Sequence, residues 1–313
     1  MPDIVVMFFL LGLLAGLVKS DLAVPKAAYD TLSLLLMLTI GLKGGMALHG
    51  NLHWSLIPEL LGVAAIGGVI PLALMPVLRR LIRLAPADSA SIAAHYGSVS
   101  AGTFAVALAF AEGRNLTIGA EVTLYLVMME LPAIMVAIAL YRRYKGKDSG
   151  ETVQGIWHET LTNRGVILLA GGAVIGAMYG PGEGAKVTEL FTGAFHAVLA
   201  LFLLQMGLTA AETLRPVPWY HWRLLAFALL APMLLSLLGL TIGLALGLPT
   251  GSLLILTALT ASASYIAAPA AMRNAIPQAN IGLAMLASLG FTFPFNVILG
   301  IPLYHQMIVW LGG

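Results

Sequence analysis

Long apolar stretches separated by short polar segments run along almost the whole chain. They lack the period-two alternation of a membrane β-strand, so each stretch predicts a helix surrounded by lipid or by other helices. Because crossing a bilayer takes about 20 apolar residues, the pattern predicts about ten transmembrane helices. The expected segments are residues 4–19, 28–48, 55–77, 88–111, 117–141, 164–180, 187–211, 219–247, 251–275 and 279–310.

Two of these segments contain small and hydroxyl-bearing residues within otherwise apolar sequence. The fourth segment contains GSVSAGTFAVA from Gly97, and the ninth contains ASASYIAAPAA from Ala261. Pro269 cannot donate a hydrogen bond to the preceding turn, and Gly97 and Gly102 tolerate unusual backbone angles. Both segments therefore predict helices that are interrupted within the membrane. Such interruptions persist only where protein or a polar cavity satisfies the freed backbone groups.

The chain divides into two halves that carry the same features in the same order. Three pairs of motifs recur at offsets of 162 to 166 residues, namely 38–45 with 203–211, 98–103 with 262–267, and 129–134 with 291–296. Each half, 1–141 and 164–313, holds five predicted spans, so the second half enters the membrane from the opposite face. The sequence thus predicts an all-α polytopic membrane protein. Its architecture is a 5+5 inverted repeat in which the two broken helices cross near the midplane.

The composition supports this class of protein. Hydrophobic residues make up 59% of the chain and charged residues 10%, with a mean hydropathy of +0.94, which excludes an ordinary soluble domain. The chain contains no cysteine, so disulfides, thiol catalysis and thiolate metal sites are excluded. His49 and His53 are four residues apart, but no third ligand accompanies them, and we expect no cofactor and no metal other than Na⁺.

The basic residues predict the orientation of the chain in a plasma membrane. By the positive-inside rule, thirteen of them fall on the cytoplasmic side. These are Lys19, Lys26, Arg79, Arg80, Arg83, Arg142, Arg143, Lys145, Lys147, Arg164, Arg215, Arg223 and Arg273, against Lys43, Arg114 and Lys186 outside. Both termini are therefore predicted to be extracytoplasmic. The charged segment 142–163 is predicted to be a cytoplasmic linker, with a docking site for a soluble regulator as the alternative.

The two interruptions are the predicted binding site. Exposed N–H groups at the start of a half-helix suit an anion, while freed carbonyls and hydroxyls suit a hard cation such as Na⁺. The candidate substrate-binding residues are Gly97, Ser98, Val99, Ser100, Ala101, Gly102, Thr103, Ser262, Ala263, Ser264, Tyr265, Ile266 and Ala267. The alternative is that these small residues only allow tight helix packing. Their recurrence in both halves favours binding.

Glu130 is the most conspicuous ionisable residue within a predicted span. A charge buried in the membrane is costly and usually lines a pathway or cavity. We therefore expect a cation-coupling set of Ser98, Ser264, Glu130 and Asn296, in which Asn296 belongs to the corresponding region of the second half. The alternative for Glu130 is a structural hydrogen bond.

These features distinguish between three classes of membrane protein: a transporter, a channel and an intramembrane enzyme. An ion-coupled importer of a small anion explains the inverted repeat, the paired interruptions and Glu130 together. A passive channel needs a continuous pore, for which two half-helices that end within the membrane are a poor design. An intramembrane enzyme needs a catalytic constellation, and the sequence offers none, so we expect a transporter.

Several motifs in order resemble the cyanobacterial sodium-dependent bicarbonate transporters and their bacterial relatives. They are LTIGLKGGMAL, GSVSAGTFAVALA, MELPA, ASASYIAAPAAMRNAIPQAN and FNVILGIPLY, and the resemblance covers nearly the whole chain. It implies ten helices, a core domain that moves against a gate domain in an elevator-type mechanism, and a homotrimer. It also implies uptake of bicarbonate with Na⁺, and a substrate site on residues 97–103 and 262–269.

The chain departs from this family at one position of the predicted site. Where the bicarbonate transporters carry an Asp within an SSSD stretch, this chain reads SASY and has Tyr265. This departure favours the alternative of a proton- or Na⁺-coupled carrier of another small carboxylate. The linker is also shorter than in the cyanobacterial proteins, which weakens the expectation that a PII-like cytoplasmic regulator binds it.

Overall fold

The computed structural model of the protein describes residues 4–51, 53, 54, 56–145, 162, 164–214 and 219–312. Regular structure in these residues is helical, as the sequence predicts, and no strand occurs among them. The first half forms α1 (Ile4–Leu17), α2 (Lys26–Leu48), α3 (Leu56–Pro76), a π-helical turn (Val77–Leu81), α4 (Pro86–Gly97), α5 (Ala101–Gly113), a 3-10 turn (Ala120–Thr123) and α6 (Leu124–Lys145).

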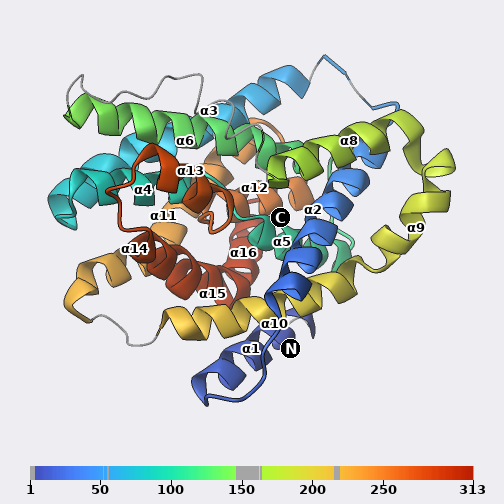
Figure 1. Ribbon diagram of the computed structural model, residues 1–313. Coiled ribbons are helices and arrows are strands. Elements are labelled where there is room, and N and C mark those ends of the chain that lie inside the picture. The colour runs from blue at the N-terminus through green and yellow to red at the C-terminus, as the bar shows by residue number, and fades with distance from the viewer. Residues whose placement is uncertain are drawn as a thin grey trace.

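The second half follows a similar order of elements (Figure 1). It forms α8 (Arg164–Glu183), α9 (Ala185–Gly193), α10 (Phe195–Thr213), a 3-10 turn (Trp219–His221), α11 (Trp222–Ala245), α12 (Thr250–Thr260), α13 (Ala267–Ala275), α14 (Ile281–Met285), a π-helical turn (Leu286–Thr292), α15 (Phe293–Phe295), a second π-helical turn (Asn296–Gly300) and α16 (Ile301–Gly312). The elements from α14 to α16 run on without a gap.

Eight helical stretches in the described residues are long and apolar enough to cross a membrane. They are 26–48, 56–81, 86–113, 120–144, 164–183, 195–213, 222–245 and 281–311. The stretch 86–113 contains the first interruption, and α1 and α12 are shorter apolar helices. A polytopic membrane protein is thereby confirmed, while the number of ten spans and the inverted repeat remain predictions.

One predicted segment, 187–211, has a different shape in the structure. Instead of a single span, α9 ends at Gly193, the chain turns at Ala194, and the apolar stretch begins at Phe195. Glycine is a poor helix former, and α9 carries the exposed Glu189, so the polar end of this segment forms a separate short helix. The predicted linker 142–163 begins within α6, and residues 146–161 and 163 lie outside the described residues.

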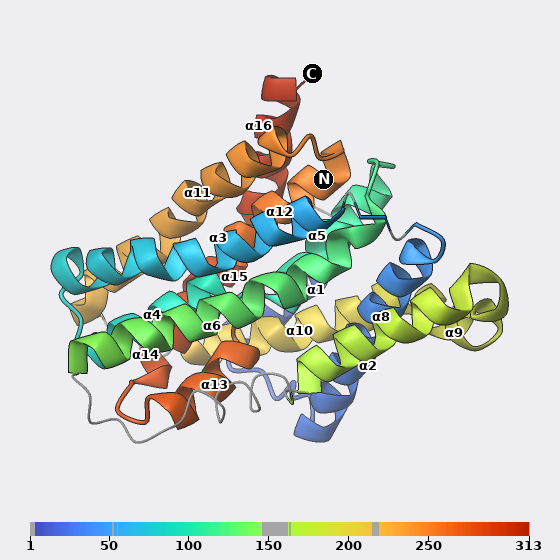
Figure 2. The same ribbon diagram turned by 90° about the horizontal axis from the view of Figure 1, so that it is seen from above.

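Two helix pairs form one side of the molecule. Figure 2 shows α2 beside α8, and Figure 1 shows α1 beside α10. Gly41 and Gly45 of α2 face the backbone of α8, and Gly12 of α1 faces the backbone of α10 at Leu204. A side chain at any of these glycines would meet backbone atoms, so the small residues let the paired helices approach closely.

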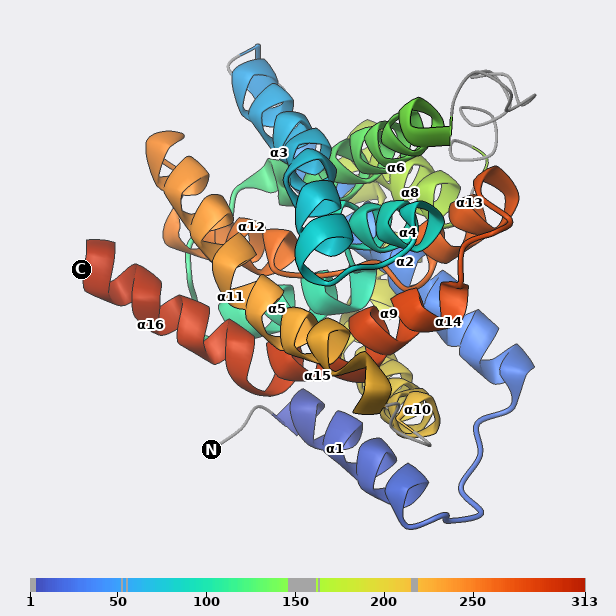
Figure 3. The same cartoon turned by 90° about the vertical axis from the view of Figure 1, so that its left-hand side faces the viewer.

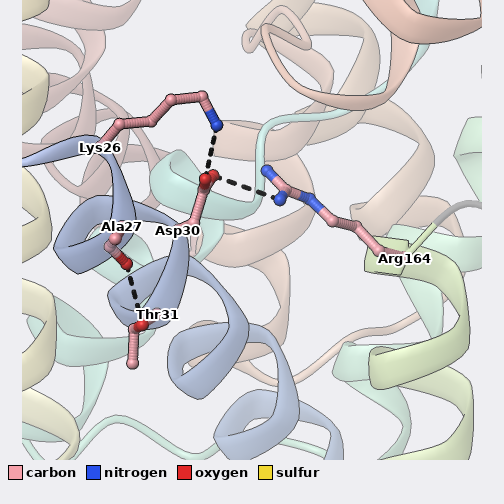
Figure 4. Close-up of polar contacts among 5 residues, drawn as sticks. All are labelled: Lys26, Ala27, Asp30, Thr31 and Arg164. Carbon is pink, nitrogen blue, oxygen red and sulfur yellow. Dashed lines mark hydrogen bonds and ion pairs between the residues drawn. The ribbon is translucent and has the colours of Figure 1, made fainter.

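A polar contact joins the first turns of α2 and α8. The Asp30 carboxylate accepts hydrogen bonds from Lys26 Nζ at 2.6 Å and from Arg164 Nη1 at 3.2 Å, and the Thr31 hydroxyl donates to the Ala27 carbonyl at 2.9 Å (Figure 4). Lys26 lies one turn before Asp30 on α2, whereas Arg164 begins α8. The contact therefore fixes the ends of the two helices relative to each other. Since these side chains are exposed to solvent, the contact contributes little to stability.

The interrupted helices lie in the interior. Residues Gly251–Thr260 of α12 are all buried, as are Ala87 and Ser89–Gly97 of α4 and Gly102–Ala111 of α5. The helices α3, α6, α11 and α16 pack around them (Figures 1 and 3). The Tyr125 hydroxyl of α6 donates to the Glu59 carboxylate of α3, which joins two of the surrounding helices. The polar interrupted segments are thus shielded from lipid by apolar helices.

Candidate functional site

The first interruption consists of Ser98, Val99 and Ser100. Helix α4 ends at Gly97, Ser98 and Ser100 are extended (φ −77°, ψ 154° and φ −100°, ψ 115°), and α5 begins at Ala101. The Ser100 hydroxyl oxygen accepts the N–H of Thr103 at 3.0 Å. A serine at this position satisfies one of the N–H groups that the first turn of a helix leaves free. The sequence therefore stops one helix and starts the next within three residues.

The second interruption is longer and spans residues 261–266 between α12 and α13. Ser264 satisfies a backbone donor in the first turn of α13, because its hydroxyl oxygen accepts the N–H of Ala268 at 3.2 Å. At the other end of the gap, Asn296 Nδ2 donates to the Ala261 carbonyl at 2.8 Å, and the Tyr304 hydroxyl donates to Asn296 Oδ1 at 2.7 Å. A carbonyl freed by the end of α12 is thus satisfied by the last helical stretch.

The two interruptions are bonded directly to each other. The N–H of Ser100 donates to the Ser262 hydroxyl oxygen at 3.0 Å, and the N–H of Ser264 donates to the His95 carbonyl at 2.6 Å. The Ser262 hydroxyl in turn donates to the Leu259 carbonyl at 2.7 Å. Each broken helix therefore satisfies a backbone N–H that the other leaves free, and these two hydrogen bonds join the interruptions directly.

A small cavity of about 20 Å³ lies where the two interruptions meet the helix pair α2 and α8. This volume is enough for a particle the size of a water molecule. Its lining residues are Met37, Val99, Ser100, Ala101, Leu126, Glu130, Gly165, Leu169, Ser264, Tyr265, Ile266 and Ala267. Ala101 begins α5 and Ala267 begins α13. The N-terminal ends of both half-helices therefore border one cavity.

The structure brings together about half of the residues predicted for the site. Val99, Ser100, Ala101, Ser264, Tyr265, Ile266, Ala267 and Glu130 line the cavity, whereas Gly97, Ser98, Gly102, Thr103, Ser262, Ala263 and Asn296 do not. Gly97 instead packs against Pro71 of α3 and Ala133 of α6, where a Cβ atom would collide with both. The buried hydroxyls of Ser98 and Thr103 have no hydrogen-bond partner among the described residues.

Four lining residues were not predicted from the sequence. Met37 comes from α2, Gly165 and Leu169 from α8, and Leu126 from α6. Each is a small or apolar residue within a predicted transmembrane helix that has no other unusual feature, so nothing in the sequence marks it as a cavity-lining residue. Their presence places the cavity on the boundary between the α2 and α8 pair and the interrupted helices.

Among the residues that the structure describes, Glu130 is the only acidic one that lines the cavity. The residue is 7% exposed, and its Oε1 atom has no hydrogen-bond partner among the described residues. No described Lys, Arg or His lines it. Because a buried carboxylate without a partner is costly, Glu130 needs either a proton or a cation from outside the chain.

Tyr265 links the second interruption to the start of α5. Its hydroxyl lies against Gly102, close enough that a Cβ atom there would collide with it, and its ring packs edge-on against Phe293 at 5.1 Å between ring centroids. Tyr265 therefore occupies the side of the α5 N-terminus with a neutral hydroxyl. A residue larger than glycine at 102 would force the Tyr265 hydroxyl to move.

Asn296 and His95 take part in the framework around the cavity. Both polar atoms of Asn296 are engaged, one with Ala261 and one with Tyr304, and the side chain is fully buried away from Glu130's cavity. His95 Nδ1 lies 2.7 Å from the Ser91 carbonyl, and its Nε2 has no partner among the described residues. Within those residues, no group of three or more His, Cys, Asp or Glu side chains is arranged to hold a metal ion.

Comparison with known protein families gives one result that agrees with this geometry. The model of the Na⁺-dependent bicarbonate transporter superfamily matches residues 4–309, nearly the whole chain. A comparison with curated proteins finds no match. The family match spans both interruptions, the cavity and the α2 and α8 pair.

Proposed function

Because the chain belongs to the Na⁺-dependent bicarbonate transporter superfamily, we propose that it imports bicarbonate together with Na⁺. One observation carries this proposal. The N-terminal ends of two half-helices and a single unpaired carboxylate border the same buried cavity. A site of this kind offers one set of groups to an anion and another to a cation.

The anion would be held by the helix ends. The first turn of each half-helix has N–H groups without intrahelical partners and carries roughly half a positive charge. Ala101 and Ala267 begin these helices, and the hydroxyls of Ser100 and Ser264 lie beside them. These groups suit the oxygens of a small planar anion such as bicarbonate, and no arginine is needed.

Na⁺ would be held by the carboxylate of Glu130 in the same cavity. The Ser264 hydroxyl would lie between the two substrates and supply a neutral oxygen to the cation, since hard cations prefer oxygen ligands. A bound Na⁺ balances the charge of Glu130 and lowers the cost of placing a second anion nearby. Coupling then follows, because the anion binds weakly until the cation is present. Ser98 and Asn296, which do not line the cavity, are left out of this proposed cation site.

Transport requires the cavity to open. Its volume of about 20 Å³ suits a water molecule or a bare cation, whereas bicarbonate has four non-hydrogen atoms and needs more room. We place the moving boundary between a gate group, α1, α2, α8 and α10, and a core group formed by the remaining long helices. Lys43 of the gate group and Glu112 of α5 form a 2.6 Å ion pair across this boundary, and that pair has to break when the groups slide. This motion corresponds to an elevator-type mechanism.

The packing of the helices supports an inverted repeat. If α1 corresponds to α8 and α2 corresponds to α10, the contact of α1 with α10 in one repeat becomes the contact of α8 with α2 in the other, and both contacts are present. In the same way, the contact of α3 with α4 corresponds to that of α11 with α12, and the contact of α5 with α12 to that of α4 with α13. We therefore retain ten crossings in two repeats, 1–141 and 164–313, in a plasma membrane with both termini outside. A homotrimer and a PII-like regulator rest on family resemblance alone.

A second candidate function is a proton- or Na⁺-coupled carrier of another small carboxylate. The observation in its favour is Tyr265, which places a neutral hydroxyl and an aromatic ring beside the start of α5. An aromatic wall suits a substrate with an apolar portion better than it suits bicarbonate. In that case Glu130 would accept a proton instead of binding Na⁺.

Uptake into proteoliposomes tests the two functions against each other. Purified full-length protein is reconstituted, and radiolabelled bicarbonate uptake is measured at fixed pH with an inward Na⁺ gradient or with choline. We expect accumulation that depends on Na⁺ and is abolished in Ser264→Leu, where a large apolar side chain fills the cavity. Uptake that is equal in choline, or none in protein shown to be folded, would contradict Na⁺-coupled bicarbonate import. Competition by small carboxylates would then identify the second candidate.

A further inference from the structure

A groove separate from the central cavity lies on the outer side of the molecule, between the end of α3 and the beginning of α11. Its volume is about 500 Å³. Figure 3 shows α3 and α11 on the same face of the molecule. The groove floor is apolar, with Leu74, Phe227, Leu230 and Leu234 among its lining residues. Leu230 and Leu234 are 61% and 68% exposed, so no part of the described chain covers them.

One end of this groove is strongly basic. Arg80 lies in the π-helical turn Val77–Leu81 that follows α3, and Arg83 comes just after this turn. Arg223 lies in the first turn of α11, so residues distant in sequence line the same groove. None of the three forms an ion pair with another described residue, and no acidic side chain lines the groove. Trp222 lies at the same end, with the Arg223 guanidinium 5.5 Å from the centre of its ring.

We propose that this groove is a binding site for an anionic phospholipid. The three guanidinium groups would bind the phosphate of the headgroup, since arginine forms paired, charge-assisted hydrogen bonds with phosphate oxygens. An acyl chain would lie on the leucine-rich floor. Trp222 marks the level of the membrane interface, where tryptophan is preferred. The basic and apolar parts of the groove therefore match the polar and apolar parts of one lipid molecule.

The combination of the two parts selects a lipid over other occupants. A free phosphate or nucleotide would use the arginines and would leave the apolar floor without a function. A second copy of the chain would have to supply acidic residues opposite three arginines. Basic pockets between membrane helices are a recurrent form of anionic lipid site. A bound lipid would also bridge α3 and α11, the helices proposed to correspond in the two repeats, and would hold the core group together.

The test uses full-length protein in detergent and two lipids with identical acyl chains, phosphatidylglycerol and phosphatidylcholine. Affinity is read from the lipid concentration that raises the melting temperature, with native mass spectrometry to count retained lipids. The variant is Arg80→Gln/Arg83→Gln/Arg223→Gln. The matched control, Arg142→Gln/Arg143→Gln/Arg273→Gln, removes the same charge at positions that do not line the groove. A second variant, Leu230→Trp, keeps the charge and narrows the floor.

We expect unmodified protein and the control to bind phosphatidylglycerol at least tenfold more tightly than phosphatidylcholine. The triple groove variant should lose on the order of a hundredfold in affinity, because each basic residue near a membrane surface contributes roughly a factor of five. Leu230→Trp should also weaken binding, which keeps the test valid if the triple variant does not fold. Equal affinity for the two lipids, equal loss in the control, protection by glycerol 3-phosphate alone, or self-association through this face would each overturn the proposal.

Discussion

At the first interruption three residues separate α4 from α5, whereas at the second six residues separate α12 from α13. In both, a serine hydroxyl accepts an N–H from the first turn of the following helix, from Thr103 to Ser100 and from Ala268 to Ser264. They differ one residue later, where Ala101 in the first half corresponds to Tyr265 in the second. The serine hydrogen bonds at the two helix breaks are thus repeated, whereas the side chains that follow them, and with them the polarity of the cavity wall, differ.

The same asymmetry holds for the other serine pair. Ser262 receives the N–H of Ser100 and donates to the Leu259 carbonyl, so its hydroxyl is fully used in joining the two interruptions. Ser98, its counterpart, has a buried hydroxyl with no partner among the described residues. Glu130 likewise has no acidic counterpart in the motif 291–296 of the second half. Two interruptions with similar frames therefore enclose an asymmetric cavity, which agrees with the proposal that it binds two unlike substrates.

Of the asymmetric groups, the Glu130 carboxylate should have the largest effect on transport when it is removed. We expect Glu130→Gln to reduce Na⁺-driven uptake on the order of a hundredfold, because a hydrogen bond or ion contact to a charged group is worth up to about 3 kcal/mol. The measurement is initial uptake as a function of Na⁺ concentration in proteoliposomes. Glu121→Gln, an acidic residue that does not line the cavity, is the matched control. An unchanged Na⁺ dependence in Glu130→Gln would return this residue to a structural role.

A methyl group at Gly102 of α5, in the first half, should displace the side chain of Tyr265 in the second half. We expect Gly102→Ala to lower stability by about 1–3 kcal/mol and uptake at least tenfold, because the new Cβ atom would collide with the Tyr265 hydroxyl. Gly102→Ala/Tyr265→Phe should recover much of both losses. Melting temperature and initial uptake are measured for both variants. If the double variant were no better than the single one, the tyrosine contact would not be the reason for the glycine.

The two unlike serines offer a more moderate test. Ser264→Ala should lower uptake about tenfold, because it removes a cavity hydroxyl and its hydrogen bond to the Ala268 N–H, worth about 1 kcal/mol. Ser98→Ala removes a hydroxyl that neither lines the cavity nor has a partner, so we expect less than a twofold change. Uptake at subsaturating bicarbonate distinguishes them. Equal losses would mean that Ser98 reaches the substrate in another conformation.

The smallest effect on transport is expected at Asn296. Asn296→Ala leaves the Ala261 carbonyl and the Tyr304 hydroxyl without their partner, which should lower stability by about 1–3 kcal/mol. The Na⁺ concentration for half-maximal uptake should stay unchanged at a temperature where the variant is folded. A shift in this concentration would restore Asn296 to the cation site predicted from the sequence.

The sequence predicts the helical fold and the interruptions because their signals are local. Apolar runs of sufficient length require helices in lipid, and small polar residues within two of them mark the breaks. What the sequence cannot give is the partner of each polar group. Ser98 and Ser100 read alike, and only the arrangement of α2, α8 and the second interruption decides that Ser100 lines the cavity. Met37 and Leu169 carry no signal at all, since they are ordinary apolar residues of ordinary spans.

Substrate protection of introduced cysteines tests most directly whether both interruptions form one substrate site. The chain has no cysteine of its own, so Ser100→Cys and Ser264→Cys each introduce a single thiol into the lining of the cavity. Ser98→Cys, at a position that does not line the cavity, is the control. The rate of reaction with a small thiol reagent is measured in proteoliposomes with Na⁺ alone, and with Na⁺ and bicarbonate. We predict that bicarbonate slows modification at positions 100 and 264, and that position 98 is unaffected. Protection at one interruption only, or at neither, would contradict a site shared by the two half-helices.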